Sequence, residues 1–285
     1  MTATWRFDAI GTGWRIDTPE PLPEDIREDV SGAIAAFDAA WSRFRGDSLV
    51  ARLAPGGEAP APPDAADMLD AYAELGRATG GAVNPLVGAS LERLGYDAAY
   101  SLRAQDPVAA PADWRARLTW RDGTLRLRGR ATIDVGALGK GRLVDRVAEL
   151  IPGPAVVDAS GDLRVRGVPQ RVALEHPYDP RRAIGVVTVT DGALCASAAN
   201  RRAWGDGLHH VLDARTGAPV RTVAATWALA ETAMSADAAA TALFFEAGPE
   251  YAHAHGVDWV RMLTDGRAEW SLGSRIERGE AELFT

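Results

Sequence analysis

Two oxygen-bearing side chains, Asp237 and Thr241, stand four residues apart in a run of strong helix formers between Ser235 and Leu243. At helical spacing, positions i and i+4 lie one above the other on the same face. A carboxylate and a hydroxyl so placed offer two hard oxygen atoms to one point, and such ligands suit Mg²⁺. The same residues also fit an ordinary helix start, with Ser235 as N-cap and Asp237 in the first turn.

A second candidate segment is DVGALGKG, residues 134–141, between a predicted β run and a predicted helix. Its glycines allow close approach of a ligand, and N–H groups at a helix start beside Lys140 favour phosphates. Asp134 could accept hydrogen bonds from a ring or a ribose, and a main-chain carbonyl could be a further metal ligand. It is not a P-loop, because Asp134 and Gly141 stand at positions that need Gly and Ser or Thr. A plain strand–turn–helix with a surface lysine is the alternative.

The third candidate is a histidine in the segment LHHVLDARTGAP, residues 208–219. Gly217 and Pro219 predict a turn at its end, and the apolar residues after His210 place that histidine on a short strand. A histidine can carry a proton near neutral pH. The alternative is a structural histidine whose hydrogen bonds are satisfied by the neighbouring turn.

Apolar periodicity predicts the elements that must position these residues. Helices are expected over 24–44, 64–78, 140–150 and 234–247. Strands are expected over 5–17 (with a break at 11–13), 114–120, 124–127, 130–135, 155–157, 163–168, 171–174, 184–189 and 258–263. Because helices and strands mix without a strict βαβ rhythm, the predicted fold class is α+β, with mainly antiparallel strands in a single compact domain over residues 1–285.

Composition excludes several functional classes. The 285 residues are 47% hydrophobic and 25% charged, as in globular proteins with a sizeable core. A net charge of −8 argues against nucleic-acid binding, and a lone cysteine, Cys195, excludes an internal disulfide or a cysteine-based zinc site in a monomer. No secretory signal or membrane segment is recognisable, so a cytoplasmic protein is expected, although a processed secreted form stays open.

The three segments together resemble motifs of one family, the FAD:protein FMN transferases or ApbE-type flavin transferases. Residues 134–145 resemble its D-x-x-A-x-x-K-G-x-x-x-D motif, residues 209–219 its H-I-I-D-P-x-T-G-x-P motif, and residues 236–243 its A-D-x-x-x-T-x-L motif. Weaker similarities follow in family order: 10–12 with M-G-T, 44–49 with a segment ending in S-E-L, 81–87 with G-x-F-D-P-T-V, 160–163 with G-G-D-I, and 195–198 with A-T-S-G. Three specific motifs in order identify the chain as a member.

The resemblance implies an ApbE-like fold and assigns a role to individual positions. Mg²⁺ would be held by Asp237, Thr241 and the backbone oxygen of Ala137, and His210 would be the catalytic residue. The positions that would contact FAD are Ile10, Phe44, Asn84, Pro85, Leu86, Asp134, Lys140, Ser197 and Val211.

The chain departs from the family pattern at a few of these positions. Ile10 replaces Met, which is an apolar exchange, and Leu86 replaces Thr, which removes a hydrogen bond worth about 1 kcal/mol. Ser160 replaces a glycine and could crowd a close backbone approach, and Ala196 and Ala198 replace Thr and Gly. These changes bear on FAD affinity or acceptor fit, whereas the metal and histidine motifs are intact.

The implied activity is transfer of the FMN half of FAD onto a Thr or Ser hydroxyl of an acceptor protein, with Mg²⁺ and with release of AMP. The implied partners are FAD and an acceptor with a segment like D-G-x-x-T or D-G-x-x-S. Such a transfer needs in-line positioning and neutralised phosphate oxygens more than covalent help from the protein. Two alternatives stay open: an FAD pyrophosphatase that gives FMN and AMP, and a non-catalytic FAD-binding protein.

Overall fold

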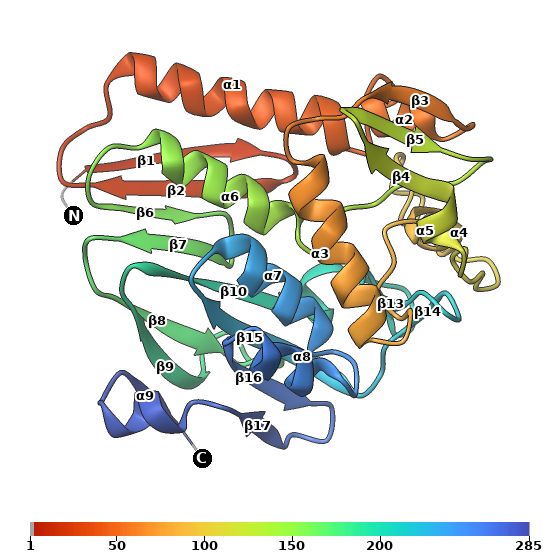
Figure 1. Cartoon of the computed structure of the whole chain (residues 1–285). Coiled ribbons are helices and arrows are strands. Elements are labelled where there is room, and N and C mark those ends of the chain that lie inside the picture. Colours follow the sequence, from red (N-terminus) through yellow and green to blue (C-terminus); the bar gives the residue numbers. More distant parts are fainter. Residues whose placement is uncertain (1–2, 285) are drawn as a thin grey trace.

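The computed structural model describes residues 3–284, and its centre is an eight-stranded sheet (Figure 1). All neighbouring strands in this sheet are antiparallel, as predicted. In spatial order the strands are β1 (Ala3–Ala9), β2 (Thr12–Thr18), β6 (Ala155–Asp158), β7 (Asp162–Arg166), β10 (Gly192–Ala198), β15 (Val223–Ala230), β16 (Asp258–Leu263) and β17 (Ala268–Trp270).

Helices cover one face of this sheet (Figure 1). They are α1 (Glu24–Trp41), α3 (Ala65–Ala78), α6 (Gly139–Leu150), α7 (Ala233–Ala242) and α8 (Gly248–Ala254). In α1 the apolar residues Val30, Ile34, Phe37 and Trp41 recur at three- and four-residue spacing, so this helix buries one stripe. Helix α7 is instead buried on nearly all sides. The resulting layer contains the main hydrophobic core.

The other face of the sheet is covered by a small three-stranded sheet of β8 (Gln170–Glu175), β9 (Ala183–Val189) and β18 (Ala281–Leu283), which α9 (Gly273–Glu277) precedes. Strand β15 shows how both faces are buried. Its Trp227 and Leu229 pack into the core under this small sheet, whereas Ala228 packs toward the helices. Side chains alternate across a strand, so a nearly all-apolar strand can serve two cores.

A peripheral unit completes the fold beside α3 (Figure 1). It contains the three-stranded sheet β3 (Gly57–Pro60), β5 (Thr124–Leu127) and β4 (Leu118–Arg121) together with the short helices α2 (Leu49–Leu53), α4 (Gly88–Arg93) and α5 (Trp114–Arg117). The segment that contains the histidine motif begins with a short 3-10 helix, η1 (Ala199–Arg202). Two short strand pairs follow it: β11 (Ala203–Trp204) with β12 (Leu208–His209), and β13 (Leu212–Asp213) with β14 (Ala218–Pro219).

Several predicted boundaries were wrong. The break expected at 11–13 in the strand over 5–17 is present but lies at Ile10 and Gly11, which adopt positive φ and form the turn of the β1–β2 hairpin. Residues 130–135 are irregular rather than a strand. The helix expected over 234–247 begins at Ala233, with Thr232 as N-cap in place of Ser235, and ends at Ala242.

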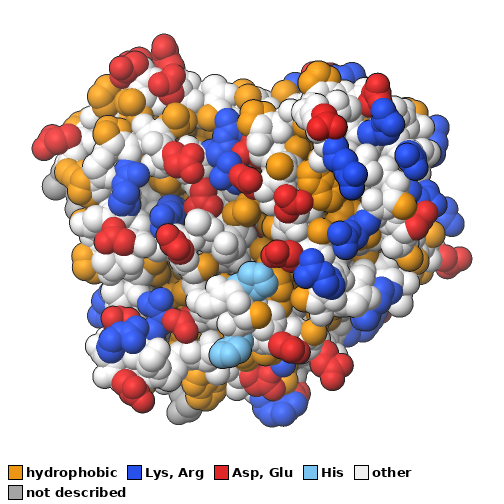
Figure 2. All heavy atoms as spheres, in the orientation of Figure 1, with side chains coloured by type: hydrophobic (Ala, Val, Ile, Leu, Met, Phe, Trp, Pro, Cys, Tyr) orange, Lys and Arg blue, Asp and Glu red, His pale blue; other side chains and the backbone are white. Residues whose placement is uncertain are grey.

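Figure 2 shows acidic and basic side chains interspersed over the face it presents, with hydrophobic side chains in small patches between them. Within residues 3–284, no helix combines the length and the apolar character that a membrane span requires.

Candidate active site

A cavity of about 900 Å³ brings the three sequence motifs together. Its lining includes the candidate residues Ile10, Phe44, Asn84, Asp134, Ala137, Lys140, Ser197, His210, Val211, Asp237 and Thr241. They come from the β1–β2 turn, the segments after α1 and α3, the loop before α6, the first turn of α6, the end of β10, the segment after β12, and α7. Residues far apart in sequence therefore share one cleft, as the motif analysis required.

Pro85 and Leu86 do not line this cavity. Leu86 is fully buried in the core, and its N–H donates to Asn84 Oδ1 at 2.9 Å. The carbonyl of Pro85 accepts from the N–H of Asp134 at 2.8 Å. These two residues hold Asn84 and Asp134 in place by hydrogen bonds. Because Leu86 does not line the cavity, the presence of Leu where the family has Thr leaves the cavity wall unchanged.

Three residues with hard oxygen atoms, Asp237, Thr241 and Ala137, line the cavity where α7 meets the loop before α6. Thr241 Oγ1 donates to the carbonyl oxygen of Ala137 at 3.0 Å, and Asp237 Oδ2 accepts from the N–H of Gly141 at 2.9 Å. Carboxylate, hydroxyl and carbonyl oxygens fit a Mg²⁺ ion, which draws its remaining ligands from water and phosphates. Among residues 3–284 no group of three or more His, Cys, Asp or Glu side chains is placed to hold a metal. Asp237 is the one acidic side chain in this set of three oxygen groups.

The close contact of α6 and α7 depends on Gly141. A Cβ atom at this position would lie 2.3 Å from the carbonyl oxygen of Ala233 and 2.7 Å from Asp237 Cβ. A second link comes from Asp145 in α6, whose carboxylate accepts from the N–H groups of Ala233 and Met234 at 2.8 Å each. Asp145 therefore caps the start of α7 and fixes its register against α6.

Asp237 sits in an unfavourable electrostatic environment. Burial raises the pKa of Asp237 to about 8, and the negative charge of Asp162 adds to this, while Lys140 opposes it. A cation bound at this carboxylate would remove the penalty, because an opposite charge favours the ionised form. The observation supports a cation-binding role for Asp237.

Lys140 lies deeper than the sequence motif suggested. Its Nζ atom is 3.1 Å from Asp162 Oδ2 and donates to the carbonyl oxygen of Ala159 at 3.1 Å. Burial lowers the pKa of Lys140, but the charges of Asp162 and Asp237 outweigh burial, and the pKa is raised overall. Lys140 is therefore a charged residue of the cavity floor, held by Asp162, rather than a free surface lysine.

The two adjacent histidines have different environments. His209 Nε2 lies 2.7 Å from the carbonyl oxygen of Val220, and its Nδ1 accepts from the N–H of Val211, so this ring is held by backbone. His210 lines the cavity, and its Nδ1 is a buried atom without a hydrogen-bond partner in the described part of the chain. Burial and the nearby charge of Arg202 lower the pKa of His210 to about 3. His210 is therefore neutral and available for a ligand.

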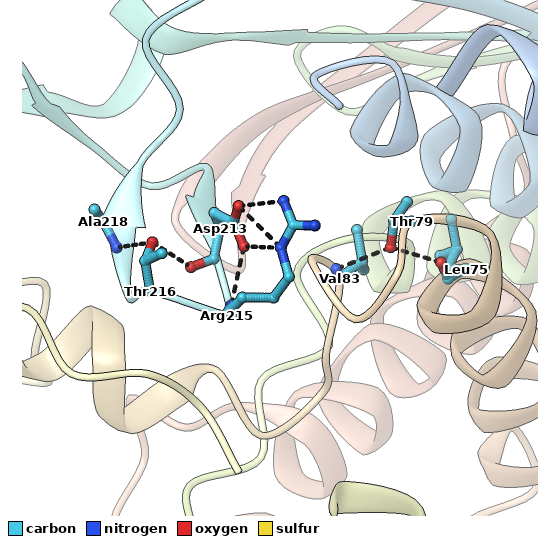
Figure 3. A network of polar contacts seen from close by, with 7 residues as sticks. All are labelled: Leu75, Thr79, Val83, Asp213, Arg215, Thr216 and Ala218. Carbon is cyan, nitrogen blue, oxygen red and sulfur yellow. Dashed lines mark hydrogen bonds and ion pairs between the residues drawn. The ribbon is translucent and has the colours of Figure 1, made fainter. Parts of the chain in front are cut away.

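The end of the histidine motif, from Asp213 to Ala218, forms a hydrogen-bonded turn (Figure 3). Asp213 accepts from the N–H and the guanidinium of Arg215, and Thr216 Oγ1 accepts from the N–H of Ala218. Nearby, Thr79 Oγ1 donates to the carbonyl of Leu75 and accepts from the N–H of Val83, which ends α3 just before Asn84. These contacts stabilise the loops that carry His210 and Asn84.

Asp134 is already bonded to protein donors. Its Oδ2 accepts from Arg43 Nε at 2.6 Å, and its Oδ1 accepts from the N–H of Gly136 at 2.7 Å. Its backbone carbonyl accepts from the Tyr72 hydroxyl at 3.1 Å. The principal contacts of Asp134 in this structure therefore hold the loop before α6.

An aromatic wall was missed by the sequence analysis, apart from Phe44. Phe44 stacks on Tyr100 and Tyr96 on Trp204, each pair with ring centroids 5.4 Å apart. The guanidinium carbon of Arg43 lies 4.1 Å from the Phe44 ring centroid. These rings come from separate segments without a common spacing, so only the folded chain reveals that they form one wall suited to a flat ring system.

The positions of the weaker motifs also border the cavity. Ile10 reaches it from the β1–β2 turn, and Ser197 from the end of β10, with Ala196 and Ala198 beside it. Ser160 adopts a left-handed backbone conformation and donates to the carbonyl of Gly13 at 2.8 Å. The serine that replaces the family's glycine is therefore tied to β2.

Comparison with known proteins identifies the family. The sequence model of the ApbE family matches residues 10–260. The chain is 31% identical to the FAD:protein FMN transferase of Rhodobacter capsulatus over 96% of its own length and 58% of that protein's length. It is 30% identical to the FAD:protein FMN transferase of Treponema pallidum, over 86% of this chain and 79% of that protein.

A solved structure shows the same fold. The ApbE protein of Thermotoga maritima superposes with a TM-score of 0.82 at 24% identity, covering 96% of this chain and 98% of that one. The family match spans the β1–β2 turn, the loop before α6, the histidine segment and α7, which are the segments that meet in the cavity. The chain therefore belongs to the ApbE family.

Proposed function

We propose that this protein is a Mg²⁺-dependent FAD:protein FMN transferase. One observation carries the proposal: Asp237, Thr241 and the Ala137 carbonyl converge in the same cavity as a neutral histidine, His210. A volume of about 900 Å³ suits a ligand of dinucleotide size. The curated relatives named FAD:protein FMN transferases support the same activity.

Each group of the cavity has a role in this reaction. A bound Mg²⁺ would neutralise charge on phosphate oxygens and polarise the phosphorus. Asp237, Thr241 and the Ala137 carbonyl would hold the ion, and the aromatic wall that includes Phe44 would take a ring of FAD. Lys140 adds positive charge at the cavity floor. The acceptor and the phosphates are thereby oriented for in-line attack.

The proton of the attacking hydroxyl needs an acceptor, and His210 is the side chain proposed for it. The acceptor oxygen forms a bond to the phosphorus of the FMN half, the bond to the AMP half breaks, AMP leaves, and the imidazole takes the proton. With a pKa of about 3, His210 is a weak base in the unliganded protein. The negative charge of a bound diphosphate would raise that pKa toward the working range.

The acceptor is proposed to carry a Thr or Ser in a D-G-x-x-T or D-G-x-x-S segment. The test incubates a fragment with such a segment with FAD and Mg²⁺, followed by mass spectrometry. A mass gain of one FMN on the hydroxyl residue is expected, and a fragment with Ala in place of Thr is the control. No mass gain, with rapid AMP release in the absence of acceptor, would instead favour the pyrophosphatase.

A further inference from the structure

Tyr72 in α3 carries a buried hydroxyl group to which the proposed reaction assigns no role. It is 1% exposed and lies among apolar residues of α3, namely Met68, Leu69 and Leu75. Burying a hydroxyl in a core is costly unless it is hydrogen-bonded, and phenylalanine would fill the same space without that cost. The hydrogen bonds of the Tyr72 hydroxyl should therefore show why a tyrosine, and not a phenylalanine, stands at this position.

Both hydrogen bonds of the Tyr72 hydroxyl go to the loop before α6. It donates to the carbonyl of Asp134 at 3.1 Å and accepts from the N–H of Ala137 at 3.2 Å. One side chain therefore spans the loop from its first residue to its fourth.

Ala137 is consequently held on both sides. Its N–H donates to Tyr72 of α3, and its carbonyl oxygen accepts from Thr241 of α7 at 3.0 Å. The side chain of Asp134, bonded to Arg43 and to the N–H of Gly136, fixes the start of the same loop. The direction of the Ala137 carbonyl thus depends on the hydroxyl of Tyr72, a residue that also lines the cavity but is not one of the proposed metal ligands.

We infer that Tyr72 is a positioning residue that orients the Ala137 carbonyl as a metal ligand. The inference rests on the proposed function, which assigns that carbonyl to Mg²⁺. Outer partners of this kind set ligand direction, and their loss typically weakens metal affinity about 10- to 100-fold. Tyr72 serves this purpose from the core, through hydrogen bonds to the backbone.

The test is Tyr72→Phe, which removes only the hydroxyl, with Mn²⁺ as the probe. Binding of Mn²⁺ is measured by electron paramagnetic resonance in the presence of ADP, and FAD binding is measured by fluorescence in EDTA. We expect Mn²⁺ affinity to fall by about tenfold, with FAD affinity in EDTA changed less than about twofold. The matched control is Tyr251→Phe in α8, another buried tyrosine, for which both affinities should stay unchanged.

Hydrogen–deuterium exchange separates a local effect from a global one. Faster exchange confined to residues 134–138 supports the inference, whereas faster exchange throughout α3 overturns it. Unchanged Mn²⁺ affinity in Tyr72→Phe also overturns it, while leaving the proposed function intact if the wild-type protein binds Mn²⁺. A wild-type protein that binds no Mn²⁺ overturns the metal assignment and the inference together.

Discussion

The catalytic proposal depends at the residue scale on a single buried carboxylate. Asp237 is 4% exposed, its Oδ2 accepts from the N–H of Gly141, and burial raises its pKa to about 8. It is the one acidic side chain among the three proposed metal ligands. A substitution that keeps the hydrogen bond of Asp237 but removes its negative charge can therefore test the two contributions separately.

Asp237→Asn keeps an oxygen that can accept from Gly141 but removes the charge. We expect Mg²⁺-dependent AMP release to fall at least about 100-fold, because a neutral amide is a poor replacement for the anionic ligand. The melting temperature without metal should not fall at neutral pH, since a carboxyl with a pKa of about 8 is already mostly uncharged there and the amide has a similar size. The control is Asp29→Asn on the exposed face of α1. Full Mg²⁺-dependent activity in Asp237→Asn would exclude this carboxylate from the site.

His210 should affect turnover more than binding. His210→Asn removes a proton acceptor that lines the cavity, so kcat is expected to fall about 10²- to 10⁴-fold. The dissociation constant of FAD, measured by fluorescence, should change by less than about threefold. His253→Asn, at an exposed position in α8, is the control. Equal kcat values would remove His210 from the mechanism.

The low pKa of His210 also has a consequence for stability. The pKa is about 3 in the folded protein and near 6.5 when unfolded, so acid favours the unfolded state. The contribution of neutral His210 to the unfolding free energy is fully present above the unfolded pKa, near 6.5, and is lost as the pH falls from there toward 3. Between about pH 7.5 and pH 5.5, the wild type should lose about 1 kcal/mol more than His210→Asn. Urea unfolding of the metal-free proteins measures this, and equal losses would contradict it.

At the scale of elements, the α6–α7 contact positions the proposed metal ligands. Asp145 caps α7 from α6, and Gly141 lets the two helices approach until Asp237 reaches the Gly141 N–H. Position 141 requires glycine because any side chain there would collide with the backbone of α7. The ligand geometry is thus a property of helix packing.

Gly141→Ala should separate these helices. The added Cβ would lie 2.3 Å from the Ala233 carbonyl, so we expect a loss of about 1–3 kcal/mol in unfolding free energy and weaker Mn²⁺ binding. The control is Gly32→Ala in α1, where an added Cβ meets nothing within 4 Å. Helix propensity predicts that this control is stabilised by up to about 1 kcal/mol. Chemical denaturation measures both, and a neutral Gly141→Ala would contradict the packing argument.

At the scale of the whole molecule, the cavity joins segments from most of the chain. Ile10 of the first hairpin and Thr241 of α7 line the same space, between the sheet edge and the peripheral aromatic residues. A ligand in that space contacts both the central sheet and the peripheral unit. Its binding should therefore stabilise the molecule as a whole.

FAD should raise the melting temperature by an amount that grows with the logarithm of its concentration above the dissociation constant. A ligand at 100 times its dissociation constant adds about 2.7 kcal/mol to the unfolding free energy. The expected result in differential scanning calorimetry is one transition that moves upward with FAD and moves further with Mg²⁺. The Asp237→Asn variant should retain the shift with FAD but lose the increment with Mg²⁺. A transition insensitive to FAD would contradict the assignment of the cavity.

Much of the molecule follows from local sequence. The stripe Val30, Ile34, Phe37 and Trp41 specifies the buried face of α1, and the i, i+4 spacing of Asp237 and Thr241 specifies their common face on α7. The strand at 258–263 was likewise predicted from its apolar residues. Motif order was sufficient for the family, which the comparisons confirmed. These features are local because they depend on backbone periodicity and residue type.

Other features depend on packing between distant segments. The hydrogen bonds of Tyr72 to Asp134 and Ala137, and the stacking of Tyr96 on Trp204, leave no spacing signal in the chain. The pKa values of Lys140 and His210 likewise follow from burial and neighbouring charge. The sequence alone determined which groups are available for chemistry and on which helices they stand. The tertiary structure decided which of them meet, because contact and desolvation arise only when separate elements pack together.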